Sequence, residues 1–158
     1  MTILKLRPLD AAAFAPFGQV LSYQLGDHVR RNYAAELFND RPGARPNLRV
    51  QRTQPTALPF AASVIERHRR SSQMFAPLSG GKYLVVVFPS DHNGQPVIAD
   101  GRAFLANGDQ AINYSRDTWH HGFQAYETAG TFLMLRWEDG TGDDEEFLTL
   151  QEPLRIEA

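Results

Sequence analysis

The first stretch of sequence that could carry chemistry combines an acid, an imidazole and an amide. Glu66-Arg67-His68 is followed, after four residues, by Gln73. On a β-strand, Glu66 and His68 would point to the same face because side chains alternate. A turn at 69–72 would place Gln73 opposite His68 on a returning strand. The sequence therefore predicts a hairpin suited to proton transfer or metal binding. The alternative is an exposed sheet face without a chemical role.

A second group of polar residues follows about forty residues later, at Asn113-Tyr114 and Trp119-His120-His121. Adjacent histidines on an extended segment face opposite ways, so at most one of the pair enters a pocket. We favour His120. The alternative is that Trp119 belongs to the core while both histidines sit at a strand end.

The elements that must position these residues are short strands rather than helices. Asp10 followed by three alanines predicts one short capped helix. Asn93-Gly94 is a hairpin signal, and the segments 83–88 and 132–135 are apolar on both faces, which predicts covered central strands. The predicted strands are 19–23, 48–52, 62–68, 73–77, 82–89, 97–105 with a break at 100–101, 110–114, 122–126, 131–137 and 146–150.

Composition limits the function classes. The 158 residues suit a single domain, 1–158, with its own hydrophobic core. A net charge of -2 gives no field that would attract nucleic acid. There is no cysteine, so any metal must bind through histidine, carboxylate or amide groups. The N-terminus resembles no signal peptide and no apolar run could span a membrane, so we expect a soluble cytoplasmic protein.

The acidic run at 139–146 has the composition of a calcium loop. It lacks the glycine and the ligand spacing that such a loop requires. We interpret the run as a solvated loop.

The spacing of the two polar groups matches the frame of cupin motifs. Glu66-Arg67-His68, Gln73 and Gly80 follow the spacing of the first motif, with Glu and Gln in place of its first His and its Glu. The stretch 108–120 resembles the second motif in length. The phrases QRTQPTALPF, IERHRRSSQMFAPLSG, FLANGDQAINYSRDTWHHGF and TFLMLRWEDG then resemble the ureidoglycolate lyase family.

This resemblance implies an all-β fold: a cupin-like double-stranded β-barrel (jelly roll) with a few short helices, assembled as a homodimer. It also implies cleavage of the small-molecule substrate ureidoglycolate to glyoxylate and urea during allantoin degradation. The reaction removes the hydroxyl proton and delivers a proton to the departing nitrogen. We expect His68 or His120 to act as the base, with Glu66 orienting the imidazole or serving as the acid.

Other residues are candidates for holding the substrate. Gln73, Asn113 and Tyr114 could bind its polar groups. Its carboxylate calls for a cation, for which the candidates by charge are Arg52, Arg67, Lys82 and Arg116. Arg67, Arg69 and Arg70 are expected at the surface.

Two further questions stay open at the level of sequence. His68, Gln73 and His120, with Glu66, could hold nickel or zinc, but an amide is a poor ligand for these ions and we expect no required cofactor. The alternative functions are a non-catalytic cupin that binds a small acid, and a metal-dependent cupin isomerase or oxygenase.

Overall fold

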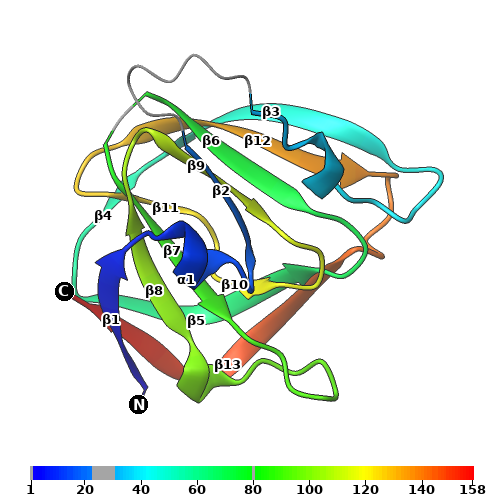
Figure 1. The fold of residues 1–158 in the computed structure, drawn as a ribbon. Coiled ribbons are helices and arrows are strands. Elements are labelled where there is room, and N and C mark those ends of the chain that lie inside the picture. The colour runs from blue at the N-terminus through cyan, green and yellow to red at the C-terminus, as the bar shows by residue number, and fades with distance from the viewer. Residues whose placement is uncertain (1, 23–30, 80) are drawn as a thin grey trace.

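The computed structural model describes residues 2–22, 31–79 and 81–158. Short strands dominate it, as the sequence predicts (Figure 1). In chain order the elements are β1 (Ile3–Pro8), α1 (Ala11–Phe14), β2 (Gly18–Ser22), the 3-10 helix η1 (Ala34–Glu36), β3 (Arg45–Thr53), β4 (Pro55–Thr56), β5 (Phe60–His68), β6 (Gln73–Ser79), β7 (Tyr83–Phe88), η2 (Ile98–Asp100), β8 (Arg102–Ala106), β9 (Gln110–Tyr114), β10 (Trp119–His120), β11 (Gln124–Tyr126), β12 (Gly130–Glu138) and β13 (Glu145–Glu157).

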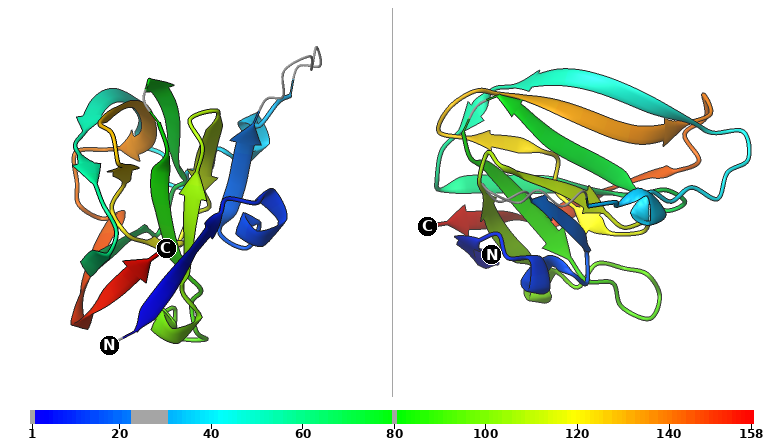
Figure 2. Two further views of the ribbon diagram at one scale, coloured as in Figure 1. Left: turned by 90° about the vertical axis from the view of Figure 1, so that its left-hand side faces the viewer. Right: turned by 45° about the horizontal axis from the view of Figure 1, so that its top comes forward.

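The strands form two sheets that lie one above the other (Figures 1 and 2). One sheet has the order β10-β5-β13-β1-β8-β7-β11-β4, and the other β2-β9-β6-β12-β3. The two-residue strand β10 pairs with both β5 and β7. The first sheet therefore closes into a ring through β10, and the predicted all-β barrel is confirmed.

Two hydrophobic cores follow from this closure. One contains residues from all six strands of the ring, among them Ile65, Phe88 and Trp119, so it fills the ring interior. The other lies between the ring and the second sheet and includes Phe75 and Phe132. Complete burial of one such side chain contributes about 1.5–3 kcal/mol.

Strand β7 separates the two cores, which explains its sequence. Val85 and Val87 belong to the core between the sheets, whereas Val86 and Phe88 belong to the ring core. All six residues of β7 are buried, so the predicted covered central strand is confirmed.

Several local predictions are confirmed. The Asp10 side chain accepts a hydrogen bond of 2.9 Å from the Ala13 N–H and caps α1. Strand β9 has the predicted bounds. The turn at Gly94, with φ of 75°, reverses the chain between the antiparallel strands β7 and β8. Of the predicted strand 19–23, residue 23 lies outside the described residues.

The sequence interpretation missed β1, β4 and β10. Strand β1 runs parallel to both β13 and β8, so distant partners create it. Strands β4 and β10 have two residues each, which is too short for a detectable alternation.

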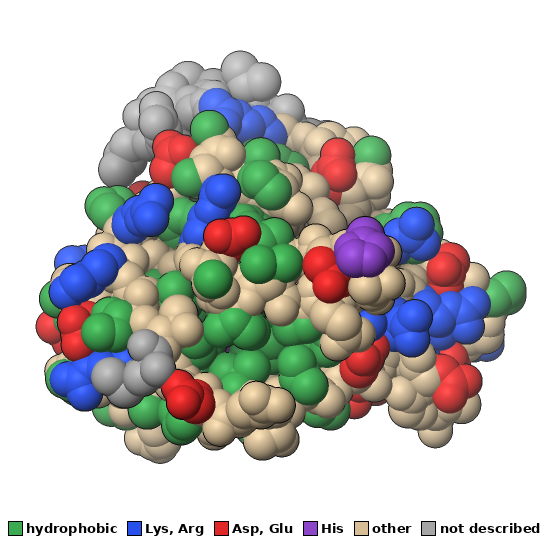
Figure 3. Space-filling view, turned by 90° about the horizontal axis from the view of Figure 1, so that it is seen from below, with side chains coloured by type: hydrophobic (Ala, Val, Ile, Leu, Met, Phe, Trp, Pro, Cys, Tyr) green, Lys and Arg blue, Asp and Glu red, His purple; other side chains and the backbone are tan. Residues whose placement is uncertain are grey.

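One face of the molecule, seen from below in Figure 3, gathers hydrophobic side chains near its centre and charged ones around its edge. A cleft of about 440 Å³ lies between residues 95–98 and the 148–152 part of β13. The candidate site residues Glu66, His68 and His120 do not line this cleft. In the described part of the chain, no helix is long and apolar enough to cross a membrane.

Candidate active site

Three side chains from two neighbouring strands converge between the sheets. Glu66 and His68 lie on one face of β5, and His120 of β10 pairs directly opposite Glu66. His120 Nε2 is 3.3 Å from Glu66 Oε1. One candidate ligand atom from each of Glu66, His68 and His120 can be chosen so that all three lie within 4.8 Å of one another. The predicted convergence of the acid and the two imidazoles is therefore present.

The predicted hairpin that was meant to bring in Gln73 is wrong. Strand β5 pairs with β13 and β10, whereas β6 belongs to the second sheet and pairs with β9 and β12. The segment 69–72 crosses between the sheets instead of reversing within one. It is held there by Asp144, whose backbone oxygen accepts from the Arg69 N–H at 2.9 Å and whose carboxylate accepts from the Arg70 N–H at 2.7 Å.

His120 directs its Nε2 atom toward Glu66. Its Nδ1 lies 2.9 Å from the carbonyl oxygen of Thr118, and a carbonyl only accepts, so Nδ1 carries the proton. In the neutral ring Nε2 is then unprotonated. This atom is buried and has no aligned hydrogen-bond partner, even at 3.3 Å from Glu66. The ring stacks on Tyr114 with 4.2 Å between centroids.

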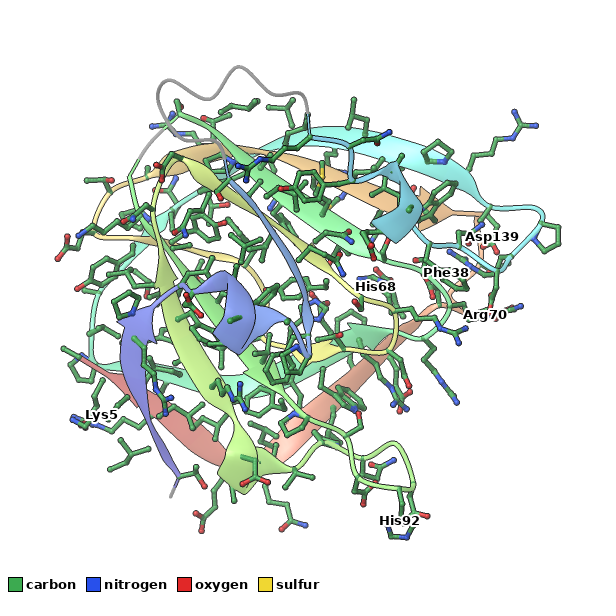
Figure 4. All side chains as sticks on the ribbon, in the orientation of Figure 1. Lys5, Phe38, His68, Arg70, His92 and Asp139 are labelled. Carbon is green, nitrogen blue, oxygen red and sulfur yellow. The ribbon has the colours of Figure 1, made fainter. Side chains whose placement is uncertain are left out.

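His68 has a similar arrangement but a different acidic neighbour. Its Nδ1 lies 3.7 Å from Asp144 Oδ2, while its buried Nε2 has no hydrogen-bond partner. Figure 4 shows His68 in the interior, whereas His92 projects from a loop at the edge of the molecule. The rings of His68 and His120 stack at 5.9 Å.

The two acids of the site are both ionised at neutral pH. Burial would raise the pKa of Glu66, but His120, with His68 and His121, outweighs it and lowers that pKa. Burial likewise opposes ionisation of Asp144. There, contacts with His68 and Ser71, the Arg70 N–H and the charge of Arg41 bring the pKa down to about 2. The site thus contains two carboxylates and two imidazoles.

A family model described as ureidoglycolate lyase matches residues 1–157. The chain belongs to the ureidoglycolate lyase family. The ureidoglycolate lyase of Rhizobium etli (strain CIAT 652) is 39% identical, with 97% of this chain and 95% of the relative covered. That of Azotobacter vinelandii is 36% identical, with 99% and 98% covered. A solved dTDP sugar isomerase from Desulfovibrio desulfuricans G20 has a TM-score of 0.49 at 13% identity, with 86% of this chain and 87% of that chain covered.

In this member of the ureidoglycolate lyase family, Gln73 and Tyr114 face the same interior as the histidines. They pair directly across β6 and β9, so they share a face. The Gln73 Oε1 atom is buried without a hydrogen-bond partner. Asn113 points the other way and donates to Gln19 Oε1 and the Glu36 carbonyl. The structure therefore brings Gln73 and Tyr114 toward the site and leaves Asn113 behind the second sheet.

The predicted cations do not join the site. Lys82 is exposed and precedes β7. It lies five residues from Val87, the partner of His120, or roughly 17 Å along a strand. Arg116 is exposed, with its guanidinium 4.7 Å from the Phe38 ring centroid and 3.5 Å from Asp40. Arg52 is exposed on the edge strand β3.

Arg67 faces away from Glu66 and His68, as expected, but the prediction that it lies at the surface is wrong. Its side chain is 5% exposed, forms ion pairs with Asp117 and Glu146, and lies 4.4 Å from the Trp119 ring centroid. Two acids compensate its charge, which allows burial. Arg69 and Arg70 are exposed, as predicted.

Two residues near the site escaped the sequence interpretation. Asp144 belongs to the acidic run interpreted as a solvated loop, yet it is buried beside His68. Arg136 lies on the same face of β12 as the buried Phe132 and Met134, and it lines a small cleft with His68. It pairs with Glu138 and Glu145. Strand alternation from Phe132 could have identified Arg136, whereas no local pattern identifies Asp144.

Proposed function

We propose that this protein is a ureidoglycolate lyase that cleaves ureidoglycolate to glyoxylate and urea. Its membership of the family and relatives of that name at 36–39% identity support the reaction. The structural observation that carries the proposal is the meeting of Glu66, His68 and His120, with both Nε2 atoms buried and unpartnered. Family membership favours this function over a non-catalytic binding module or a metal-dependent isomerase or oxygenase.

The reaction moves two protons. A base takes the proton from the substrate hydroxyl, the carbon–oxygen double bond of glyoxylate forms, and the carbon–nitrogen bond breaks as the nitrogen of urea receives a proton. We assign the base to His68 and the acid to His120. The assignment rests on the carboxylate beside each ring. The charge of Asp144, beside His68, is compensated by Arg41. The positive charges that act on Glu66, beside His120, come from histidines. Glu66 is thus placed to stabilise an imidazolium at His120.

The remaining polar groups suggest how the substrate lies. The free Gln73 Oε1 is an acceptor suited to the N–H groups of the ureido end. Burial raises the pKa of Tyr114 well above its usual value, so its hydroxyl stays neutral beside His120. Arg136 shares a cleft with His68, so we assign the substrate carboxylate to its side of the site. This assignment replaces Lys82 and Arg116.

The same side chains also fit a divalent transition metal. Two imidazole lone pairs and one carboxylate form a donor set that zinc or nickel accepts. Glu66, His68 and His120 would hold the ion, which would act as a Lewis acid on a substrate oxygen. Gln73, which the sequence suggested as a ligand, is better used on the substrate because amides bind these ions weakly. We propose the metal-free arrangement.

We further propose that the protein is a homodimer. The outer face of the second sheet carries Leu48 and Val50 of β3, which are 63% and 61% exposed, and Leu78 of β6, which is 56% exposed. Leu48 and Val50 pair with Leu135 and Leu133 of β12, so the apolar face is continuous across the strands. An exposed apolar sheet face is typical of an interface between copies. A cytoplasmic location stays a prediction.

The decisive experiment measures glyoxylate and urea released from ureidoglycolate by the purified protein, corrected for spontaneous breakdown. We expect equimolar products above the background rate. The Glu66→Gln variant, with unchanged circular dichroism, serves as the matched inactive protein. A wild-type rate equal to the background, with or without added nickel or zinc, would refute the proposed function.

A further inference from the structure

Asp144 is surrounded by hydrogen-bond donors on both carboxylate oxygens. Oδ1 accepts from the Arg70 N–H at 2.7 Å. Oδ2 accepts from the Ser71 hydroxyl at 2.5 Å and from Arg41 Nη2 at 3.0 Å. The residue is 4% exposed. These contacts fix the carboxylate in one orientation, because each oxygen has its own partners.

The same Oδ2 atom faces the imidazole of His68. At 3.7 Å, His68 Nδ1 is too distant for a hydrogen bond but close enough for a strong electrostatic preference. An ionised carboxylate only accepts, so it favours a proton on Nδ1. The neutral ring then has its lone pair on Nε2, which is buried without a hydrogen-bond partner. A nitrogen of His68 lies within 4.8 Å of ligand atoms of both Glu66 and His120.

We propose that Asp144 is a positioning residue that holds His68 in the Nδ1–H tautomer, with the Nε2 lone pair directed at the substrate. A carboxylate behind a catalytic or metal-binding imidazole fixes which nitrogen is free. Asp144 also fixes the chain that follows His68, through its contacts with the backbone of Arg69 and Arg70. It therefore sets both the ring tautomer and the point at which β5 leaves the first sheet.

Arg41 makes this arrangement possible. It is 4% exposed and links Asp144 to Asp139 and to the carbonyl of Trp137. Its charge compensates the buried carboxylate, so Asp144 can orient His68 without requiring the ring to become a cation. His120 also carries a proton on Nδ1, held there by the Thr118 carbonyl.

The test compares Asp144→Asn with Asp139→Asn in the full chain. The Asp144 oxygens accept from the Arg70 N–H, the Ser71 hydroxyl and Arg41. An amide nitrogen in place of either oxygen cannot accept, so Asp144→Asn removes both the charge and part of this set of contacts. In Asp139→Asn the same charge is lost and Arg41 loses one partner, but His68 keeps Asp144. Nitrogen-15 NMR of the imidazoles gives the tautomer, and steady-state kinetics gives kcat and KM.

We expect wild-type His68, when neutral, to carry its proton on Nδ1. Asp144→Asn should increase the Nε2–H form and lower kcat roughly 10- to 100-fold with little change in KM. Asp139→Asn should retain the wild-type tautomer and kcat. A folded Asp144→Asn protein with unchanged tautomer and kcat would overturn the proposal.

The NMR spectrum of the wild-type protein tests the positioning role of Asp144 even if Asp144→Asn does not fold. A neutral His68 that carries its proton on Nε2 in the wild type refutes the positioning role. The catalytic consequence rests on the proposed function, but the tautomer does not depend on it. A wild-type protein without lyase activity and with the Nδ1–H form would reject the proposed function and retain the placement of His68 by Asp144.

Discussion

His120 Nε2 and Glu66 Oε1 lie 3.3 Å apart across the β10–β5 pair without the alignment of a hydrogen bond. Nε2 of His120 is thus available to another partner, and the carboxylate is close enough to stabilise the positive charge of a ring protonated on that nitrogen. A group that exchanges protons with a substrate needs a ring nitrogen that no other residue occupies and a nearby charge that stabilises its protonated form. His120 and Glu66 meet both conditions.

Replacement of His120 should remove the acid. His120→Gln keeps a polar side chain but cannot transfer a proton, so kcat should fall about 10²- to 10⁴-fold. His92→Gln, in an exposed loop, is the control and should retain wild-type activity. Product release under saturating substrate measures both variants. A His120→Gln protein as active as the control would exclude His120 from the proton transfer.

Removal of Arg136 should weaken substrate binding. A hydrogen bond to a charged group contributes about 1.5–3 kcal/mol, so Arg136→Gln should raise KM roughly 10- to 100-fold. Arg49→Gln is the control, because Arg49 approaches the same Glu138 at 3.6 Å but does not line the cleft with His68. Initial rates over a range of substrate concentrations distinguish the two. Equal KM values in both variants would place the carboxylate elsewhere.

Acid should destabilise the protein through Asp144. Its pKa is about 2 when folded against an ordinary value of 3.8, so the unfolded chain binds the proton more readily. The stabilisation, about 2 kcal/mol, is complete above the unfolded pKa and is lost as the pH falls toward about 2. Urea unfolding at several pH values should show the gap between wild type and Asp144→Asn narrowing in this window. Asp143→Asn, in the same loop, should show no such narrowing.

Chelation should leave the activity intact in the metal-free arrangement. We expect protein treated with a chelator, and shown to be metal-free by elemental analysis, to retain its rate of glyoxylate release. Loss of activity that nickel or zinc restores would establish the alternative, in which Glu66, His68 and His120 bind the ion.

Charge on the outer face of the second sheet should separate the proposed dimer. The double substitution Leu48→Glu and Val50→Glu places two carboxylates on that face, and sedimentation should then give a monomer. Ile3→Glu changes an apolar residue of β1 that is 48% exposed and should leave the dimer intact. A double variant with the wild-type mass in solution would move the interface to another surface.

The sequence by itself determined the fold class, most strands and the central part of the site. Strand alternation placed Glu66 and His68 on one face, and the opposite orientation of neighbouring residues selected His120 over His121. The meeting of Glu66, His68 and His120 agrees with the local geometry of one strand. His121 lines a cleft with Glu66, so the choice of His120 over His121 stays a prediction. The all-apolar sequence of β7 likewise indicated a strand covered on both faces.

Only the tertiary structure decided which strands meet. The turn 69–72 has no local signal that distinguishes a hairpin from a crossing between sheets, and Asp144, far along the chain, selects the crossing. The same contact makes one member of an acidic run a buried partner of His68, although Asp143 beside it is exposed. Burial and charge compensation arise from residues distant in sequence, such as Arg41, and no local pattern records such partners.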